Sequence, residues 1–160
     1  MRLFAYGADM GSAAVEGLLG RRVVARRALL RGFRLAFTTM SEDGEGGIAD
    51  IVKDEEAEVE GVVFDLSPED ELRLGFAEGL EGGPYRRRRV PVELEDGEEG
   101  EAVAREVASK RPHIPPSPTY LDAMVSAATE RGLSEGYIDF LLQLYPDEPT
   151  PLARAWSEDE

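Results

Sequence analysis

The sequence contains no cysteine and a single histidine, His113, among its 160 residues. Without cysteine the chain can form no disulfide, no thiolate nucleophile and no cysteine metal site. A Ser-His-Asp catalytic group would have to use His113, and a histidine-rich zinc site cannot be built. His113 lies in the proline-rich stretch KRPHIPPSP, which favours a loop residue over a catalytic base. We therefore expect no bound metal.

Long apolar runs are also missing. No run approaches the roughly 20 residues that a membrane helix needs, and the first residues already alternate like a strand. The chain lacks the basic start and the apolar run that a signal peptide would show. These absences predict a cytoplasmic protein with no membrane partner.

Basic residues are few, with 18 Lys and Arg against 33 Asp and Glu and a formal net charge of −15. An acidic surface repels phosphate groups, so nucleic acid is not an expected partner. The stretch YRRRRV, residues 85–90, runs against this balance. Strand alternation would put Arg86 and Arg88 on one face and Arg87 and Arg89 on the other. We expect these arginines to pair with nearby acids on a sheet surface, although one of them could hold a substrate carboxylate.

The chain has the size and composition of one folded domain. Hydrophobic residues make up 42% and charged residues 32% of the sequence, which is ordinary for a globular protein. We assign residues 1–150 to a single domain and residues 151–160 to a solvated acidic tail.

Apolar alternation predicts six strands, at 2–6, 32–38, 46–54, 57–67, 85–95 and 101–107. An acidic turn around Asp54 to Glu56 is expected to join the third and fourth, and a polar hairpin turn the last two. Helices are predicted at 12–19, from Ser67 with Leu72 on its apolar face, from Ser117 to Gly132, and from Ser134 to Pro146. Strands that precede a helix pair predict an α+β domain with a strongly curved or closed sheet and helices outside it.

The stretch FAYGADM, residues 4–10, ends the first strand on Gly7. A strand that runs through glycine into a helix directs backbone N–H groups beyond the strand end, where they can bind a carboxylate. An ordinary tight turn with Asp9 as helix cap is the alternative. Taken alone, the stretch favours the turn.

A candidate acid–base residue follows the helix that begins at Ser67. The residues just before Glu78 are apolar, and the glycine-rich sequence GLEGGPY follows it directly. A half-buried carboxyl there can have a raised pKa and act as both base and acid. Glu81 is a rival, but it lies between glycines and is expected to be more exposed. A solvated glutamate is the alternative for both.

In combination, these stretches resemble the gamma-glutamylcyclotransferase family. The family's opening F-A-Y-G-S-N is similar to residues 4–9, and its F-x-L-x-F strand to residues 33–37. Its Gly-Gly-Ile-Ala and Gly-Val-Val motifs are found at 46–49 and 61–63, its Glu-Gly-apolar…Gly…Tyr element at 78–85, and its Pro-Ser-Pro-x-Tyr at 116–120. The matches follow in order along nearly the whole chain.

The resemblance implies a small mixed or antiparallel β-barrel with flanking helices. It also implies an enzyme that cyclises a gamma-glutamyl dipeptide or amine, an acyl-transfer or amidine-lyase type of reaction. The substrate's α-amine attacks its own γ-carbonyl, which gives 5-oxoproline and frees the attached amino acid or amine. Because the nucleophile belongs to the substrate, we expect no cofactor. The expected partner is a small gamma-glutamyl molecule, and a homodimer stays open.

The resemblance also assigns roles to residues. Glu78 is the implied general acid/base. The substrate-binding residues that it implies are Tyr6, Gly7, Ala8, Asp9, Met10, Tyr85 and Tyr120, with the backbone of residues 7–9 holding the glutamyl carboxylate.

The chain departs from the family pattern at Ala8 and Asp9, where Ser and Asn are usual. Asp9 adds negative charge beside the implied carboxylate site, so we expect its side chain to turn away and cap the following helix. The same departure leaves a second hypothesis, a non-catalytic binding or interaction module that keeps the fold.

Overall fold

The computed structural model describes residues 1–74 and 84–146. Glu78, Glu81 and the predicted tail at 151–160 lie outside the described residues. The strands are β1 (Arg2–Ala5), β2 (Ala25–Met40), β3 (Gly47–Asp65), β4 (Tyr85–Leu94) and β5 (Glu99–Val107). The helices are the 3-10 turn η1 (Ala8–Met10), α1 (Ser12–Leu19), α2 (Pro68–Arg73), α3 (Pro118–Arg131) and α4 (Glu135–Leu142).

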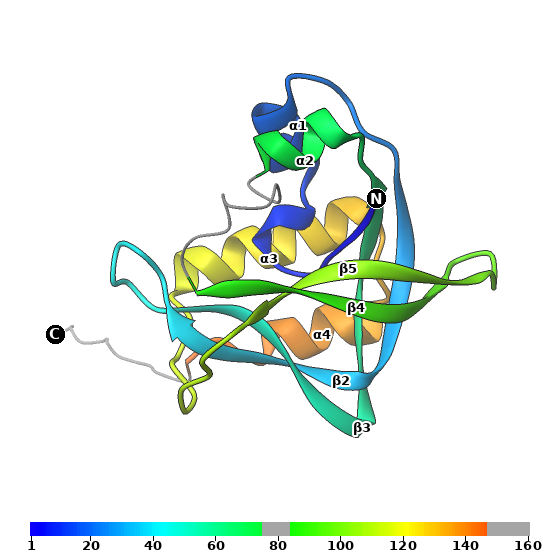
Figure 1. Ribbon diagram of the computed structural model, residues 1–160. Helices are drawn as coiled ribbons and strands as arrows, with labels where there is room; N and C mark the ends of the chain where they lie inside the picture. The colour runs from blue at the N-terminus through cyan, green and yellow to red at the C-terminus, as the bar shows by residue number, and fades with distance from the viewer. Residues whose placement is uncertain (75–83, 147–160) are drawn as a thin grey trace, which may run out of the picture.

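The strands close into a barrel in the order β1-β3-β2-β4-β5, which confirms the predicted α+β barrel. All pairings are antiparallel except that of β1 with β5, where Leu3 lies opposite Val103. Figure 1 shows α3 and α4 side by side along the barrel, and α1 with α2 near the N-terminus. Because β1 closes the barrel between β3 and β5, the chain that leaves β1 lies beside both strands.

The long β2–β3 hairpin corrects one prediction. Residues 46–67 were expected to form two strands joined by an acidic turn, but β3 runs unbroken from Gly47 to Asp65. The pairing with β2 shifts register opposite Gly32, from Phe33↔Lys53 to Arg31↔Glu58. Gly32 has a φ of +87°, which suits glycine at a bulge. The acidic residues therefore form a bulge that bends one strand.

Serine caps position the helices as the sequence predicts. Ser67, Ser117 and Ser134 each accept a hydrogen bond from a backbone N–H in the first turn of α2, α3 and α4. Gly132 ends α3 in the left-handed region, with a φ of +75°. The predicted apolar face of α2 is wrong at Leu72, which is 53% exposed. Asp70 is buried in its place, because it completes the capping box and pairs with Arg21.

Candidate active site

A cavity of about 230 Å³ opens where β1 runs into the turn η1. Its lining residues come from β1, η1, β3, β4, β5 and α3: Leu3, Phe4, Tyr6, Gly7, Ala8, Asp9, Ile48, Ala49, Tyr85, Arg105 and Tyr120. All of the substrate-binding residues expected from the sequence line this cavity except Met10. Met10 is fully buried, with its side chain in the core.

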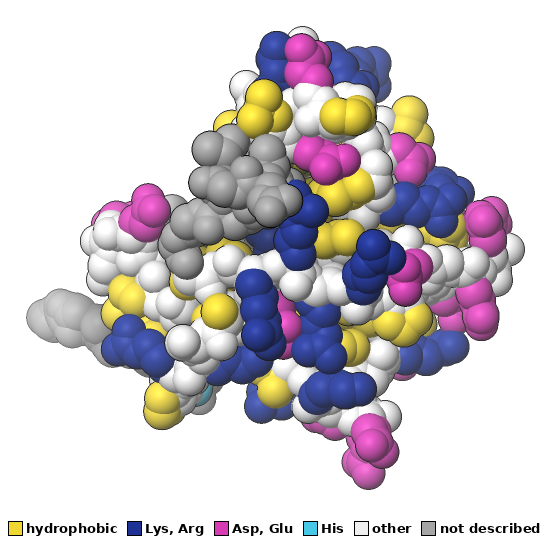
Figure 2. Space-filling view, viewed as in Figure 1, with side chains coloured by type: hydrophobic (Ala, Val, Ile, Leu, Met, Phe, Trp, Pro, Cys, Tyr) yellow, Lys and Arg dark blue, Asp and Glu magenta, His cyan; other side chains and the backbone are white. Residues whose placement is uncertain are grey.

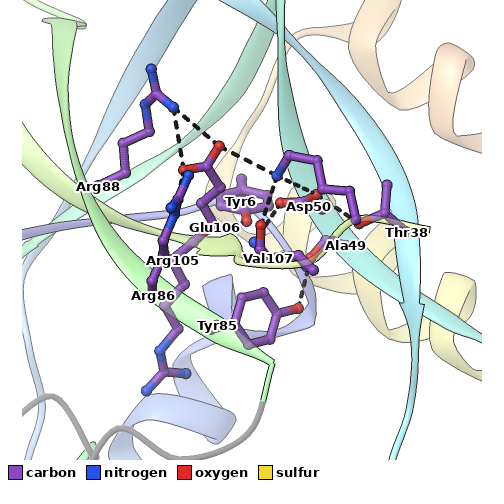
Figure 3. Close-up of polar contacts among 11 residues, drawn as sticks. Tyr6, Thr38, Ala49, Asp50, Tyr85, Arg86, Arg88, Arg105, Glu106 and Val107 are labelled. Atoms are coloured by element: carbon purple, nitrogen blue, oxygen red, sulfur yellow. Dashed lines mark hydrogen bonds and ion pairs between the residues drawn. The ribbon is translucent and has the colours of Figure 1, made fainter.

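Two tyrosines are fixed on the backbone of Ala49. The Tyr85 hydroxyl donates to the Ala49 carbonyl at 2.7 Å, as Figure 3 shows, and the Ala49 N–H donates to the Tyr120 hydroxyl at 3.1 Å. Tyr6 donates from its hydroxyl to the Arg105 carbonyl on β5. The three rings therefore converge on the cavity from β4, α3 and the end of β1, each held by a backbone group.

These tyrosines stay neutral at physiological pH. Burial raises the pKa of Tyr120 to about 12, against hydrogen bonds from Ala49 and Ala8 that lower it. Burial also raises the pKa of Tyr6 and of Tyr85 well above the ordinary value. Their hydroxyl groups can therefore donate or accept hydrogen bonds but do not supply negative charge.

Asp9 brings a carboxylate to the cavity, contrary to the expectation that it turns away as a cap. The N-cap residues of η1 and α1 are Gly7 and Gly11, and no side chain caps either one. The Ser12 N–H at the start of α1 donates instead to Glu130 of α3. Asp9 is exposed, but the atoms around its carboxyl still shield it from part of the solvent and raise its pKa, while Arg105 and the backbone N–H groups of Gly7 and Asp9 oppose the rise.

The backbone of residues 7–9 forms part of the cavity wall. The N–H groups of Gly7 and Asp9 lower the pKa of the Asp9 carboxyl, and that of Ala8 lowers the pKa of Tyr120. The predicted carboxylate site at the backbone of residues 7–9 stays a prediction, with the Asp9 charge close to it.

Comparison with known proteins identifies the family. A model of the AIG2-like family matches residues 58–141. The gamma-glutamylcyclotransferase of Mus musculus is 30% identical over 149 residues, which cover 91% of this chain and 79% of the mouse protein. The chain belongs to the gamma-glutamylcyclotransferase family.

Other members of the family agree with this assignment. The gamma-glutamylcyclotransferase of Bos taurus is 29% identical over 149 residues, with 91% of this chain and 79% of the bovine protein covered. A solved structure named gamma-glutamyl cyclotransferase superposes with a TM-score of 0.81 at 26% identity, covering 94% of this chain and 90% of that one. The barrel described above is therefore the gamma-glutamylcyclotransferase fold.

Arg105 is a cavity residue that the sequence did not reveal in this family member. It lies on β5, and its guanidinium donates to the Leu74 carbonyl at the end of α2. Its charge reaches both Asp9 and Tyr85, whose pKa values it lowers against the effect of burial. In the sequence, Arg105 is one polar residue of an alternating strand, which does not mark it as a site residue. Its position next to β1 arises only when the barrel closes.

A buried charge network lies behind the Ala49 peptide. Asp50 is fully buried and accepts hydrogen bonds from the Thr38 hydroxyl at 2.7 Å and the Val107 N–H at 2.9 Å. Lys110 donates to Asp50 at 2.9 Å and also lies 3.3 Å from Glu106. The network ties β2, β3 and β5 together beside the cavity.

The arginine run lies on the barrel surface, as expected. Arg86 and Arg88 both pair with Glu106 across the β4–β5 ladder, and Arg89 pairs with Glu101. Figure 2 shows basic side chains over the β4–β5 face with acidic ones among them. Burial raises the pKa of Glu106, but Lys110 and Arg88 outweigh it and lower the pKa. The run therefore supports the sheet and lies apart from the cavity walls.

The remaining candidates give simple outcomes. His113 lies in a loop with its ring edge-on to Phe37, 6.4 Å between centroids, and does not line the cavity. Within residues 1–74 and 84–146, no cluster of three or more acidic or histidine side chains could hold a metal ion. Over the same residues, no helix is long and apolar enough to cross a membrane.

Proposed function

We propose that the protein is a gamma-glutamylcyclotransferase-like enzyme. It converts a gamma-glutamyl dipeptide or amine to 5-oxoproline and the free amino acid or amine. The observation that carries this proposal is the cavity at the end of β1, where Tyr6, Tyr85 and Tyr120 meet the backbone of residues 7–9 in a member of this family. A space of about 230 Å³ suits a head group the size of an amino acid better than a larger ligand.

The proposed reaction needs positioning and one proton carrier. The substrate's α-nitrogen forms a bond to its γ-carbonyl carbon, and the bond from that carbon to the leaving nitrogen breaks. Held in a near-attack geometry by rigid walls, the amine reacts as part of the same molecule, which can lower the barrier substantially. Glu78 accepts the proton of the α-ammonium and later gives a proton to the leaving nitrogen.

The test is release of 5-oxoproline from a panel of gamma-glutamyl dipeptides and gamma-glutamyl amines. We expect the wild type to release it and Glu78→Gln to lose about 100-fold or more in rate, in the range of general acid–base catalysis. Glu81→Gln is the matched control, since it removes a neighbouring carboxylate and should keep the activity. No release by the wild type, or equal release by Glu78→Gln, would exclude this function.

A non-catalytic binding module is the second candidate. The observation that favours it is Asp9 on the cavity wall, where an uncharged Asn is usual in the family. This hypothesis predicts that 5-oxoproline or a gamma-glutamyl ligand binds without being turned over. Incubation of each ligand with the protein, followed by quantitation of the intact ligand, separates the two functions.

A further inference from the structure

The cavity beyond the end of β1 has residues of β3 and of the β4–β5 hairpin in its wall. In the barrel order β1-β3-β2-β4-β5, β1 separates β3 from β5. β1 pairs with β3 at residues 62–65 and lies opposite β5 at Leu3↔Val103. The start of β3, at residues 47–53, pairs with β2. Contacts between the start of β3 and the end of β5 therefore depend on side chains.

Two hydrogen bonds join consecutive residues of β3 to one residue pair of the β4–β5 hairpin. The Tyr85 hydroxyl donates to the Ala49 carbonyl at 2.7 Å. The Val107 N–H donates to the Asp50 carboxylate at 2.9 Å. Tyr85 and Val107 lie directly opposite each other in the β4–β5 ladder. The two contacts, which Figure 3 shows, therefore hold the hairpin to β3 at one place beside the cavity.

The Asp50 carboxylate accepts the Val107 N–H where a backbone carbonyl would accept it in a strand ladder. Asp50 is fully buried, and its second oxygen accepts from the Thr38 hydroxyl at 2.7 Å and from Lys110 at 2.9 Å. A buried carboxylate without an opposite charge destabilises the fold, so the bridge to Val107 depends on Lys110. Lys110 also donates to the Val107 carbonyl at 2.9 Å, and it therefore binds both sides of the bridge.

This bridge lies within reach of the cavity wall. Burial is the main cause of the raised pKa of Tyr6 and of Tyr85, and the Asp50 charge adds to it. Arg105 lines the cavity and lies two residues before Val107 on β5. A shift of Val107 away from Asp50 would therefore move this part of the wall.

We propose that Asp50 and Lys110 are positioning residues of the candidate active site, whose bridge to Val107 sets the distance between the β3 wall and the β4–β5 wall of the cavity. This inference rests on the proposed function. Neither Asp50 nor Lys110 is among the residues that line the cavity, so both act through the backbone that they hold. In an intramolecular cyclisation the walls fold the substrate for attack, and a misplacement of about 1 Å can lower the rate on the order of 100-fold.

The kinetics of 5-oxoproline release test the bridge. Lys110→Met leaves the Asp50 carboxylate without its charge partner, and we expect kcat to fall about tenfold or more while KM stays within about threefold of the wild type. Lys110→Arg keeps the positive charge and should retain more of kcat than Lys110→Met. The double variant Asp50→Asn/Lys110→Met places a neutral acceptor opposite Val107 and should regain part of the lost kcat.

Leu141→Ala is the control for a loss of stability alone. Leu141 is fully buried on α4 and is not among the residues that line the cavity. Its truncation should lower the melting temperature and leave kcat unchanged at a temperature where circular dichroism shows every variant folded. A wild-type kcat in Lys110→Met, or an equal fall of kcat in Leu141→Ala, would overturn the proposal.

Amide hydrogen exchange tests the bridge without the reaction. In Lys110→Met the Val107 amide should exchange about tenfold or more faster relative to the most protected amides of the β2–β3 hairpin, because its acceptor is no longer held. In Leu141→Ala all of these amides should change together. An unchanged relative exchange of Val107 in Lys110→Met would overturn the proposal.

The inference and the proposed function fail separately. No 5-oxoproline release by the wild type would exclude the proposed function, and the exchange of the Val107 amide would still decide whether Asp50 and Lys110 hold the wall. Release at an equal kcat by the wild type and Lys110→Met would keep the enzyme and exclude the inference.

Discussion

At the scale of single residues, the peptide of Ala49 organises the cavity. Its N–H and carbonyl bind Tyr120 and Tyr85, so two side chains from distant parts of the chain take their positions from one residue of β3. Because side chains alternate between the two faces of β3, the next side chain, Asp50, lies on the other side and belongs to the buried charge network. A change in either tyrosine therefore affects both the stability and the shape of the site.

Tyr85→Phe tests this arrangement. The substitution leaves the Ala49 carbonyl without its hydroxyl donor, and an unsatisfied buried acceptor costs about 1–2 kcal/mol. We expect the free energy of unfolding to fall by about that amount in urea denaturation, and 5-oxoproline release to slow. Tyr145→Phe is the control, because its hydroxyl bonds Asp122 at the surface and water can replace it. Equal stability of Tyr85→Phe and the wild type would contradict this role.

At the scale of elements, the β4–β5 hairpin combines a buried ion network with an exposed ion pair. The side chain of Glu106 is 4% exposed and forms ion pairs with Arg86, Arg88 and Lys110. The side chain of Glu101 is 62% exposed and forms an ion pair with Arg89. The two glutamates lie on the same strand and pair with the same neighbouring strand, so they differ mainly in burial.

Glu106→Gln should therefore lower the free energy of unfolding much more than Glu101→Gln. Removing the buried charge leaves three cations around a neutral amide, and we expect a loss of about 2–3 kcal/mol in the free energy of unfolding. The exposed pair is worth less than about 0.5 kcal/mol. Urea unfolding of both variants at pH 7 makes the comparison. Similar losses in the free energy of unfolding would show that burial does not set the strength of these ion pairs.

Two glycines, one in α1 and one in β3, provide a second comparison at the scale of elements. Gly17 lies inside α1 with no atom near the position of an added Cβ, so Gly17→Ala should stabilise the fold by about 0.5–1 kcal/mol. At Gly61 of β3 the added Cβ would overlap the Ala5 carbonyl oxygen of β1, so Gly61→Ala should destabilise the barrel. Thermal unfolding of both variants measures the two opposite shifts. A lower melting temperature for Gly17→Ala would contradict the first, and an unchanged one for Gly61→Ala the second.

At the scale of the whole molecule, buried acids couple stability to pH. A hydrogen bond from Arg21 holds the pKa of Asp70 below its ordinary 3.8, and the pKa of Glu106 lies below its ordinary 4.5. A pKa that is lower in the folded state stabilises the fold fully above the unfolded value. That stability is lost as the pH falls through the folded value.

We therefore expect the free energy of unfolding to fall as the pH drops below about 4.5. Urea titrations at a series of pH values measure this fall. The gap in stability between wild type and Glu106→Gln should shrink over the same range, because the wild-type carboxyl becomes protonated as well. A gap that stays constant down to the acid limit would show that the charge of Glu106 does not contribute.

Local signals explain what the sequence could predict. The bounds of α1 follow from the helical spacing of its apolar residues, and the starts of α2, α3 and α4 follow from serine caps, which act within one turn of helix. The sequence did not predict the unbroken β3, because a short acidic segment between two apolar stretches is typical of a turn. Only the pairing with β2 reveals the bulge opposite Gly32. Arg105 and the direction of Asp9 were also missed, since both depend on how the closed barrel brings β1 and β5 together.

The central claim is that a gamma-glutamyl substrate is cyclised and not hydrolysed. The most direct measurement is the product balance when a gamma-glutamyl dipeptide or amine is incubated with the protein. The account predicts one 5-oxoproline for each amino acid or amine set free, with no glutamate. Release of glutamate in place of 5-oxoproline, or no release of either, would contradict it.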